Sequence, residues 1–224
     1  MSGMTGARST HRGDLLARVH DPSFPCLGAK AAAKRGLIHT QEFKNLLVDP
    51  SEIRDLAASL EAFVDEYSSP RSEFAVLVTI DVGTKMASET EFETYLWGVL
   101  QKVHELDAAE WDPKYSTDPH DASFKFSFGG RAFYVVGLSP TASRVARRFS
   151  YPTIVFNPVW QFERLREVAQ LEGLIDRIRS RDARLQGSIN PNLEFEGIRS
   201  DALQYSGRRV DASWQCPFRL KESS

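Results

Sequence analysis

Two cysteines are the residues of this sequence best suited to reactive chemistry, and each lies beside a proline and a phenylalanine. Cys26 ends a Phe-Pro-Cys segment, and Cys216 begins a Cys-Pro-Phe segment. Because proline fixes the φ angle of the backbone, a neighbouring thiol is held in one direction, which suits a metal ligand or a buried structural contact. One of these two thiols is therefore the first candidate for a reactive centre.

A histidine, His104, is a second candidate ligand, carried by an expected helix. Ser88 and Glu91 have the spacing of a capping box, which predicts a helix from that point to about residue 107. Trp97, Gln101 and His104 then share a side of this helix that differs from its apolar stripe. Two interpretations stay open: a helix packed on two sides with His104 hydrogen-bonded in the interior, or a His104 that faces a ligand or metal.

The composition favours a globular protein of one domain that binds small molecules or proteins. The chain has 224 residues, of which 42% are hydrophobic and 26% charged, enough to bury a core. Its net charge of -2 gives no overall field that would draw it to nucleic acid or to an anionic membrane. We therefore expect no nucleic-acid partner and no membrane partner, and we leave the formation of a homodimer open.

The pattern of apolar residues predicts a cytoplasmic protein. No apolar run approaches the roughly 18 residues that cross a bilayer, and the first 20 residues lack the apolar stretch of a secretory signal. In a reducing compartment the two cysteines are expected to stay as thiols.

Periodicity predicts the main elements. We expect a disordered tail at 1–12 and a single domain over 13–224, with a helix from about 51 to 68 and a buried strand at 74–80. Strands at 123–128 and 132–136, joined by Gly-Gly, predict a β-hairpin.

The remaining elements are a short basic helix around 144–148, a strand at 153–156 and a long helix from 159 to about 185 with an irregularity at Gly173. The strands cluster rather than alternate with helices. This order favours an α+β fold, a mostly antiparallel sheet of about four strands covered by helices.

Familiar catalytic motifs do not occur. The sequence has no phosphate-binding loop, dinucleotide fingerprint, nucleophile elbow or His-Glu-x-x-His motif, and its cysteines and histidines lack zinc spacing. What stands out is a set of polar strings without helix or strand period. They are Phe-Pro-Cys-Leu-Gly-Ala-Lys (24–30), Leu-Trp-x-x-Leu-Gln-x-x-His-x-x-Asp (96–107), Gly-Leu-Ser-Pro-Thr-Ala-Ser-Arg-Val-Ala-Arg-Arg-Phe (137–149), Phe-Asn-Pro (156–158), Gln-Phe-Glu (161–163), Arg-Asp (181–182), Leu-Gln-Gly-Ser-Ile-Asn-Pro-Asn (185–192), Gln-Tyr-Ser-Gly-Arg (204–208) and Trp-Gln-Cys-Pro-Phe (214–218).

With these strings, the stretch from Phe24 to Phe218 resembles the YqcI/YcgG family, and within it the short branch related to a haem-dependent pre-guanitoxin N-hydroxylase. The resemblance implies haem b as cofactor, dioxygen and an electron-donating reductase as partners, and hydroxylation of a guanidine nitrogen of arginine or an arginine-derived small molecule. One segment departs from the family: relatives commonly read Asn-Pro-His where this sequence reads Asn157, Pro158 and Val159.

Given a haem, Cys26 is the first choice of axial ligand, with His104 and Cys216 as alternatives. A thiolate donates electron density that favours O–O cleavage, whereas a neutral imidazole donates less. Cys26 has a second interpretation as a small buried apolar residue.

Arginines are the expected partners of the haem propionates, which are anions. Arg144, Arg147 and Arg148 cluster in the basic segment, and on a helix Arg144 and Arg148 would share one face; Arg208 is a fourth candidate for the cofactor site. The alternative is that these arginines form surface ion pairs.

A guanidinium ligand requires a carboxylate that accepts two hydrogen bonds, with aromatic faces nearby. Glu163 and Asp107 are the candidate carboxylates, and Tyr205 is the third candidate for the catalytic site, where it would close the pocket together with Arg208. Either carboxylate could instead be a helix-end charge. Two other functions remain as alternatives to the monooxygenase: a non-catalytic haem carrier or sensor, and a haem-free small-molecule binding protein.

Overall fold

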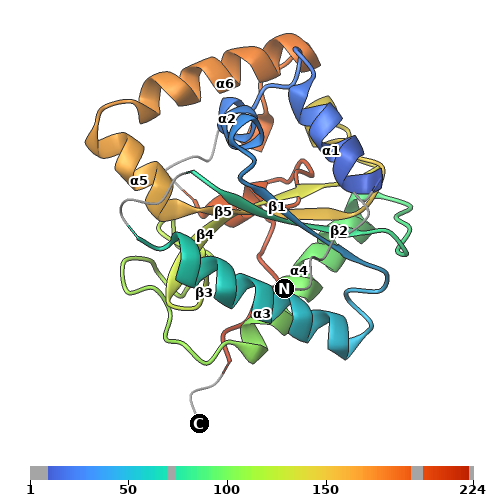
Figure 1. Ribbon diagram of the computed structural model, residues 1–224, viewed down its shortest axis with the longest axis vertical. Coiled ribbons are helices and arrows are strands. Elements are labelled where there is room, and N and C mark those ends of the chain that lie inside the picture. Colours follow the sequence, from blue (N-terminus) through green and yellow to red (C-terminus); the bar gives the residue numbers. More distant parts are fainter. Residues whose placement is uncertain (1–9, 70–73, 193–198, 222–224) are drawn as a thin grey trace, which may run out of the picture.

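A five-stranded sheet forms the centre of the molecule in the computed structural model, which describes residues 10–69, 74–192 and 199–221 (Figure 1). The strand order is β1-β2-β5-β4-β3, with β1 and β2 parallel and the other pairs antiparallel. The strands are β1 (Ile38–Phe43), β2 (Val76–Asp81), β3 (Phe126–Phe128), β4 (Arg131–Leu138) and β5 (Thr153–Pro158). The expected single-domain α+β fold with a mostly antiparallel sheet is confirmed.

The sheet has one strand more than the four expected. The additional strand, β1, reads Ile-His-Thr-Gln-Glu-Phe and has a polar centre, so it lacks the apolar run or strict alternation that marks a strand in sequence. It lies at the edge of the sheet, where only one side pairs with a neighbouring strand.

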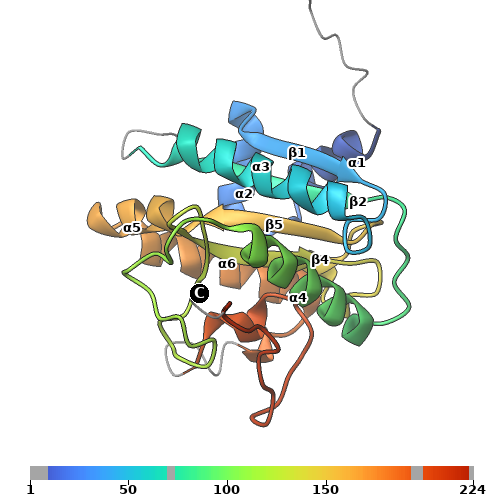
Figure 2. The ribbon, with the colours of Figure 1, turned by 90° about the horizontal axis from the view of Figure 1, so that it is seen from below.

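Helices cover both faces of the sheet. Figure 1 shows α3 and α4 on one side and α1, α2, α5 and α6 on the other, and Figure 2 shows the C-terminal segment lying beside α4. The helices are α1 (Thr10–His20), α2 (Leu27–Arg35), α3 (Pro50–Tyr67), α4 (Glu89–Leu106), α5 (Val159–Glu167) and α6 (Leu171–Gln186). The part of the chain with described coordinates contains no helix that is long and apolar enough to cross a membrane.

The predicted start of α4 at Ser88 is confirmed, but the return contact of Glu91 goes to the residue before the cap rather than to Ser88 itself. The hydroxyl of Ser88 accepts from the amide of Glu91 at 3.1 Å, and the Glu91 carboxylate reaches back to the amide of Ala87 at 2.6 Å. Helix α3 begins at Pro50, one residue before the expected start, and its N-cap is Asp49, whose carboxylate accepts from the amide of Ser51 at 2.8 Å.

Two helix predictions were wrong. The basic segment is a single 3-10 turn, η1 (Val145–Arg147), flanked by extended residues, so Arg144 and Arg148 do not share a helix face. The long helix after residue 159 is two helices, and the break lies at 168–170, where Ala169 has a φ of 54°, rather than at Gly173, which lies inside α6.

The chain termini differ from the prediction in one detail. Residues 10–12, expected within a disordered tail, form the first turn of α1, whereas 1–9 lie outside the described residues. At the other end, the segment after the 3-10 helix η3 (Asp201–Gln204) has little regular structure and is ordered by packing, since Gln101 of α4 both accepts from and donates to the main chain of Arg219.

Candidate functional site

The two thiols lie in different parts of the core. Cys216 belongs to the cluster between the sheet and helices α3 and α4, whereas Cys26 packs against the cluster beneath α1 and α2. Both are free thiols, which agrees with the expectation that they form no disulfide. The surroundings of each thiol decide which could act as a ligand.

Cys26 stands at the N-terminus of helix α2 and caps it. Its Sγ accepts a hydrogen bond from the amide of Ala29 at 3.4 Å, and the residue is half-buried. Burial raises the pKa of the Cys26 thiol, while the amides of Ala29 and Gly28 and the charge of Arg147 act in the opposite direction. A thiol at this place is protonated when free, but it already faces the groups that stabilise a thiolate.

Cys216 and His104 are interior residues. Cys216 is 1% exposed, and burial raises the pKa of its thiol to about 12. The His104 ring packs against Phe218 and Trp111, its Nε2 accepts from the amide of Lys221 at 3.2 Å, and burial lowers its pKa. Nδ1 of His104 is buried and has no hydrogen-bond partner among the residues described. These contacts match the interpretation of His104 as a hydrogen-bonded interior residue.

The half-buried side chain of Arg147 lies between β4 and the C-terminal segment. It donates to the carbonyl oxygens of Gly137 at 3.1 Å, Tyr205 at 3.3 Å and Gln204 at 3.1 Å. Burial lowers the pKa of Arg147. Its donors therefore hold the main chain of two segments together.

The other two arginines of this region also bind protein groups. Arg144 forms an ion pair with Asp182 of α6 and donates to the carbonyl oxygen of Ser188. Arg148 is exposed and donates to the carbonyl oxygens of Ala142 and Ser143. Of the three, Arg148 is the one whose guanidinium faces solvent.

The expected carboxylates are both hydrogen-bonded within the protein. Glu163 on α5 accepts from the Tyr115 hydroxyl at 2.8 Å and from Nζ of Lys114 at 3.1 Å. Burial alone would raise the pKa of Glu163, but the two hydrogen bonds together with the charges of Lys114 and Arg131 outweigh it and lower the pKa. Asp107 caps the C-terminus of α4 and accepts from the amides of Ala109 and Gly129, each at 3.0 Å.

Tyr205 is fully buried rather than at a pocket opening. Its hydroxyl accepts from the amide of Phe126 at 3.2 Å and donates to the carbonyl oxygen of Phe133 at 3.3 Å. Burial raises the pKa of Tyr205 well above its usual value. The ring of Trp97 stacks on it with the centroids 5.6 Å apart.

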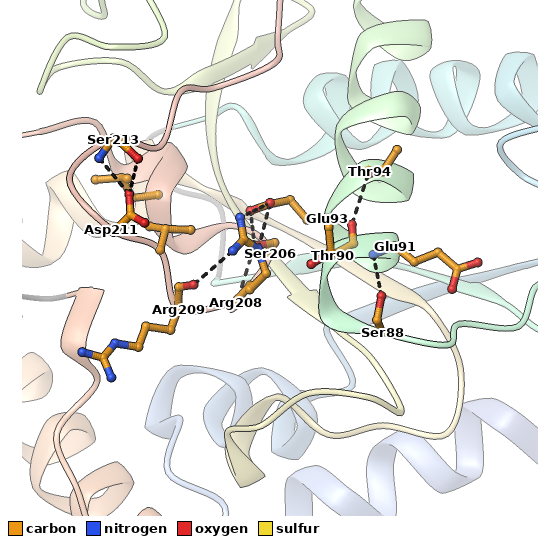
Figure 3. A network of polar contacts seen from close by, with 12 residues as sticks. Ser88, Thr90, Glu91, Glu93, Thr94, Ser206, Arg208, Arg209, Asp211 and Ser213 are labelled. Carbon is orange, nitrogen blue, oxygen red and sulfur yellow. Dashed lines mark hydrogen bonds and ion pairs between the residues drawn. The ribbon is translucent and has the colours of Figure 1, made fainter.

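A third carboxylate, Glu93, was not singled out from the sequence, and it binds the guanidinium of Arg208 (Figure 3). Its Oε2 accepts from Nε of Arg208 at 2.9 Å and from Nη2 at 2.6 Å, and its Oε1 accepts from the Ser206 hydroxyl at 3.0 Å. The Glu93 side chain is 11% exposed and that of Arg208 is 26% exposed. The pair is therefore largely shielded from water. Charge-assisted hydrogen bonds are strong in such a shielded place.

This ion pair lies on the wall of a hollow of about 510 Å³, which we call the Glu93 hollow. That size is within the range of small-molecule sites. Its lining residues are Glu93, Thr94, Trp97, Gly98, Gln101, Arg208, Trp214, Gln215 and Pro217. The hollow thus contains both a carboxylate that binds a guanidinium and aromatic rings. This combination is expected of a guanidinium receptor.

A sequence signal for Glu93 did exist. Trp97 and Gln101 mark a second side of α4, and Glu93 lies one turn before Trp97 on that side. Extending the stripe by four residues would have reached it. Its partner could not have been found in this way, because Arg208 is 115 residues further along the chain.

Among the residues that the structure describes, no group of three or more His, Cys, Asp or Glu side chains could hold a metal ion. A haem differs, because the porphyrin supplies four nitrogens and the protein needs only an axial ligand. The residues that could provide such a ligand are Cys26 at its helix N-terminus and, deeper in the core, His104 and Cys216.

Comparison with curated proteins finds two relatives at low identity. "Uncharacterized protein YqcI" of Bacillus subtilis (strain 168) is 28% identical over 135 residues, which are 57% of this chain and 53% of that protein. "Putative N(omega)-hydroxy-L-arginine synthase DcsA" of Streptomyces lavendulae is 24% identical over 163 residues, which are 67% of this chain and 58% of that protein. The chain thus spans a little over half the length of these relatives.

No solved structure matches the chain significantly. The profile of the YqcI/YcgG family, in contrast, matches residues 15–219, which include both thiols, helix α4 and the Glu93–Arg208 ion pair. A match over nearly the whole chain establishes the relationship: this protein is a member of the YqcI/YcgG family.

Proposed function

We propose that this protein hydroxylates a guanidine nitrogen of arginine or of a small arginine derivative, with haem b bound through Cys26. One oxygen atom of O₂ is inserted into an N–H bond of the guanidine to give N–OH, the other leaves as water with two protons from solvent, and a partner reductase supplies the two electrons. The named activity of the Streptomyces relative, a synthase of N(omega)-hydroxy-L-arginine, supports the reaction type. The observation that carries the proposal is the position of Cys26, a half-buried thiol at the N-terminus of a helix.

The residues around Cys26 favour a thiolate ligand. The positive end of α2 and the nearby Arg147 charge stabilise the thiolate, and Phe24, a buried side chain of the same cluster, makes the surroundings of Cys26 apolar. Bound haem would supply the iron that activates dioxygen, and a thiolate ligand favours O–O cleavage. Ligation would release the thiol proton, which the raised pKa otherwise retains.

The two alternative ligands fit less well. Cys216 and His104 lie among packed aromatic rings of the main core, and Phe218 contacts the His104 ring with the centroids 5.0 Å apart. A macrocycle there would displace that core. Val159 is a buried apolar residue at the first position of α5, so it offers no ligand where relatives have histidine.

Among the arginines, Arg148 would be the one to bind a propionate, because its guanidinium is exposed and its partners are two main-chain carbonyls. Using Arg147 instead would break the contacts between β4 and the C-terminal segment.

The test is hemin titration of the purified full chain, followed by absorption spectroscopy of the ferrous-CO complex. We expect stoichiometric binding and a thiolate-type band in the wild type and in Cys216→Ser, and loss of that band in Cys26→Ser. Serine retains a helix-capping oxygen, so Cys26→Ser separates ligation from folding. An unchanged spectrum in Cys26→Ser would exclude Cys26 as the ligand.

Turnover is tested with the loaded protein, L-arginine, O₂ and a reductant, with N-hydroxylated product measured by mass spectrometry. Stoichiometric haem without arginine-dependent O₂ consumption would favour a haem carrier or sensor. A protein that stays colourless with hemin would favour the haem-free binding function.

A further inference from the structure

We propose that the Glu93 hollow is a guanidinium-binding site of this protein and that Arg208 is a built-in occupant which the ligand displaces. The hollow lies beside α4, on the face of the sheet opposite the α1 and α2 side where Cys26 packs, so a guanidine held here is apart from the proposed iron (Figure 1). The inference rests on the proposed function only for the chemical class of the ligand, a guanidine. It goes further by naming the receptor carboxylate and by giving Arg208 a regulatory role, that of an internal competitor.

The contacts of Glu93 are those of a guanidinium receptor. Arg208 presents Nε and Nη2 to the carboxylate, and Ser206 donates to the other oxygen and fixes its orientation (Figure 3). A free guanidinium carries the same planar fork of N–H donors as an arginine side chain. The carboxylate is therefore positioned for a ligand of this shape and charge.

Displacement of Arg208 by such a ligand leaves no buried charge unpaired. Breaking a buried ion pair is costly chiefly because one charge remains without a partner. When one guanidinium replaces another, Glu93 retains a cation and its hydrogen bonds, while the Arg208 side chain, already 26% exposed, enters water. The exchange therefore costs far less than removal of Arg208 alone.

The backbone at Arg208 is held in place, so the exchange requires rotation of its side chain alone: its carbonyl oxygen accepts from Asn192 at 2.8 Å and its amide donates to the Ser206 hydroxyl at 3.3 Å. Gly207 precedes Arg208 with a φ of 80°, a conformation that glycine adopts without steric cost. Beyond it the chain to residue 221 has no helix or strand. The Arg208 side chain can thus turn away from Glu93 without breaking a regular element.

The rest of the hollow suits a planar cation with an aliphatic chain. Trp97 and Trp214 line it, with their ring centroids 6.3 Å apart, and aromatic faces attract cations and cover methylene groups. A lysine ammonium lacks the fork that bonds a carboxylate through two nitrogens. We therefore expect the site to prefer arginine and short guanidines over lysine.

Isothermal titration calorimetry of the full chain without added hemin tests this inference separately from catalysis. The titrants are L-arginine and, as the control ligand, L-lysine. We expect Arg208→Ala to bind arginine at least tenfold more tightly than the wild type, because its competitor is gone, and Glu93→Gln to bind it at least tenfold more weakly. Asp201→Asn, which breaks the Lys125–Asp201 ion pair in the same C-terminal segment, should bind like the wild type.

The double variant Glu93→Gln/Arg208→Gln guards against misfolding, because it removes both buried charges together. It should unfold at a temperature near that of the wild type and yet fail to bind arginine. Weaker binding by Arg208→Ala, wild-type binding by Glu93→Gln, equal affinity for lysine, or no arginine binding by any variant would each overturn the inference. If the variants bind arginine in the expected pattern but the protein takes up no haem, the proposed reaction is refuted and the guanidinium site is still supported.

Discussion

The guanidinium of Arg147 donates to the main-chain carbonyl oxygen of Tyr205, and the amide of Gly137 in β4 donates to the same oxygen at 2.7 Å. A side chain from η1 and the backbone of β4 thus bind one atom of the C-terminal segment. This segment carries Ser206 and Arg208, which bind Glu93 on α4. The Arg147 contact therefore positions the residues that face the Glu93 hollow.

Replacement of Arg147 by lysine should destabilise the protein by about 1–3 kcal/mol, because a single ammonium cannot reach all three carbonyl oxygens from the same place. Urea denaturation measures the change. The matched control is Arg148→Lys on the exposed neighbour, expected within about 0.5 kcal/mol of the wild type. Equal effects of the two substitutions would show that the three carbonyl contacts of Arg147 contribute little.

Gly137→Ala should destabilise the protein because helix α4 packs directly on this position of β4. An added Cβ would lie 2.6 Å from the Phe92 ring and 2.8 Å from Leu96. Overpacking of this kind costs about 1–3 kcal/mol. The control is Gly13→Ala in α1, where nothing lies within 4 Å and the substitution should stabilise by about 0.5–1 kcal/mol. Thermal melts of both variants give the comparison, and tolerance of Gly137→Ala would contradict the tight contact.

His104 should make the protein less stable in mild acid. Burial lowers its pKa, so the folded state favours the neutral ring, while the unfolded chain takes up a proton near pH 6.5. The contribution of the neutral His104 ring to the free energy of unfolding is thus fully present above about pH 6.5. It is lost as the pH falls from there through the folded pKa, and the free energy of unfolding then changes by at most about 1.4 kcal/mol per pH unit.

Urea denaturation at about pH 5 and pH 7.5 checks this behaviour. We expect His104→Gln to show a smaller difference between the two pH values than the wild type, since glutamine does not titrate. His20→Gln, at the exposed end of α1, should keep the wild-type difference. If His104→Gln keeps it as well, the acid sensitivity arises elsewhere.

Several features of this protein could be predicted from the sequence because their signals are local. The cap of α4, in which Ser88 accepts from the amide of Glu91, lies within four residues. The hairpin of β3 and β4 is specified by Gly129 and Gly130 with φ of 60° and 70°, and the stripe of α3 repeats at helical spacing. The polar strings between these elements carry the likeness to the family. Hydrogen bonds between near neighbours and repeated apolar contacts depend on the spacing of residues along the chain, so they can be predicted from the sequence without the tertiary structure.

Only the tertiary structure decided the rest, because those features join residues that are distant in sequence. The polar strand β1 is stabilised by pairing with β2, and the helix expected from residue 159 to about 185 is divided into α5 and α6. Folding also placed the two thiols in separate clusters and engaged Glu163 and Asp107 with neighbouring donors. Above all, folding brought Glu93 to Arg208, which is 115 residues further along the chain. The strength of this ion pair depends on both side chains being shielded from water, and no spacing in the sequence encodes that.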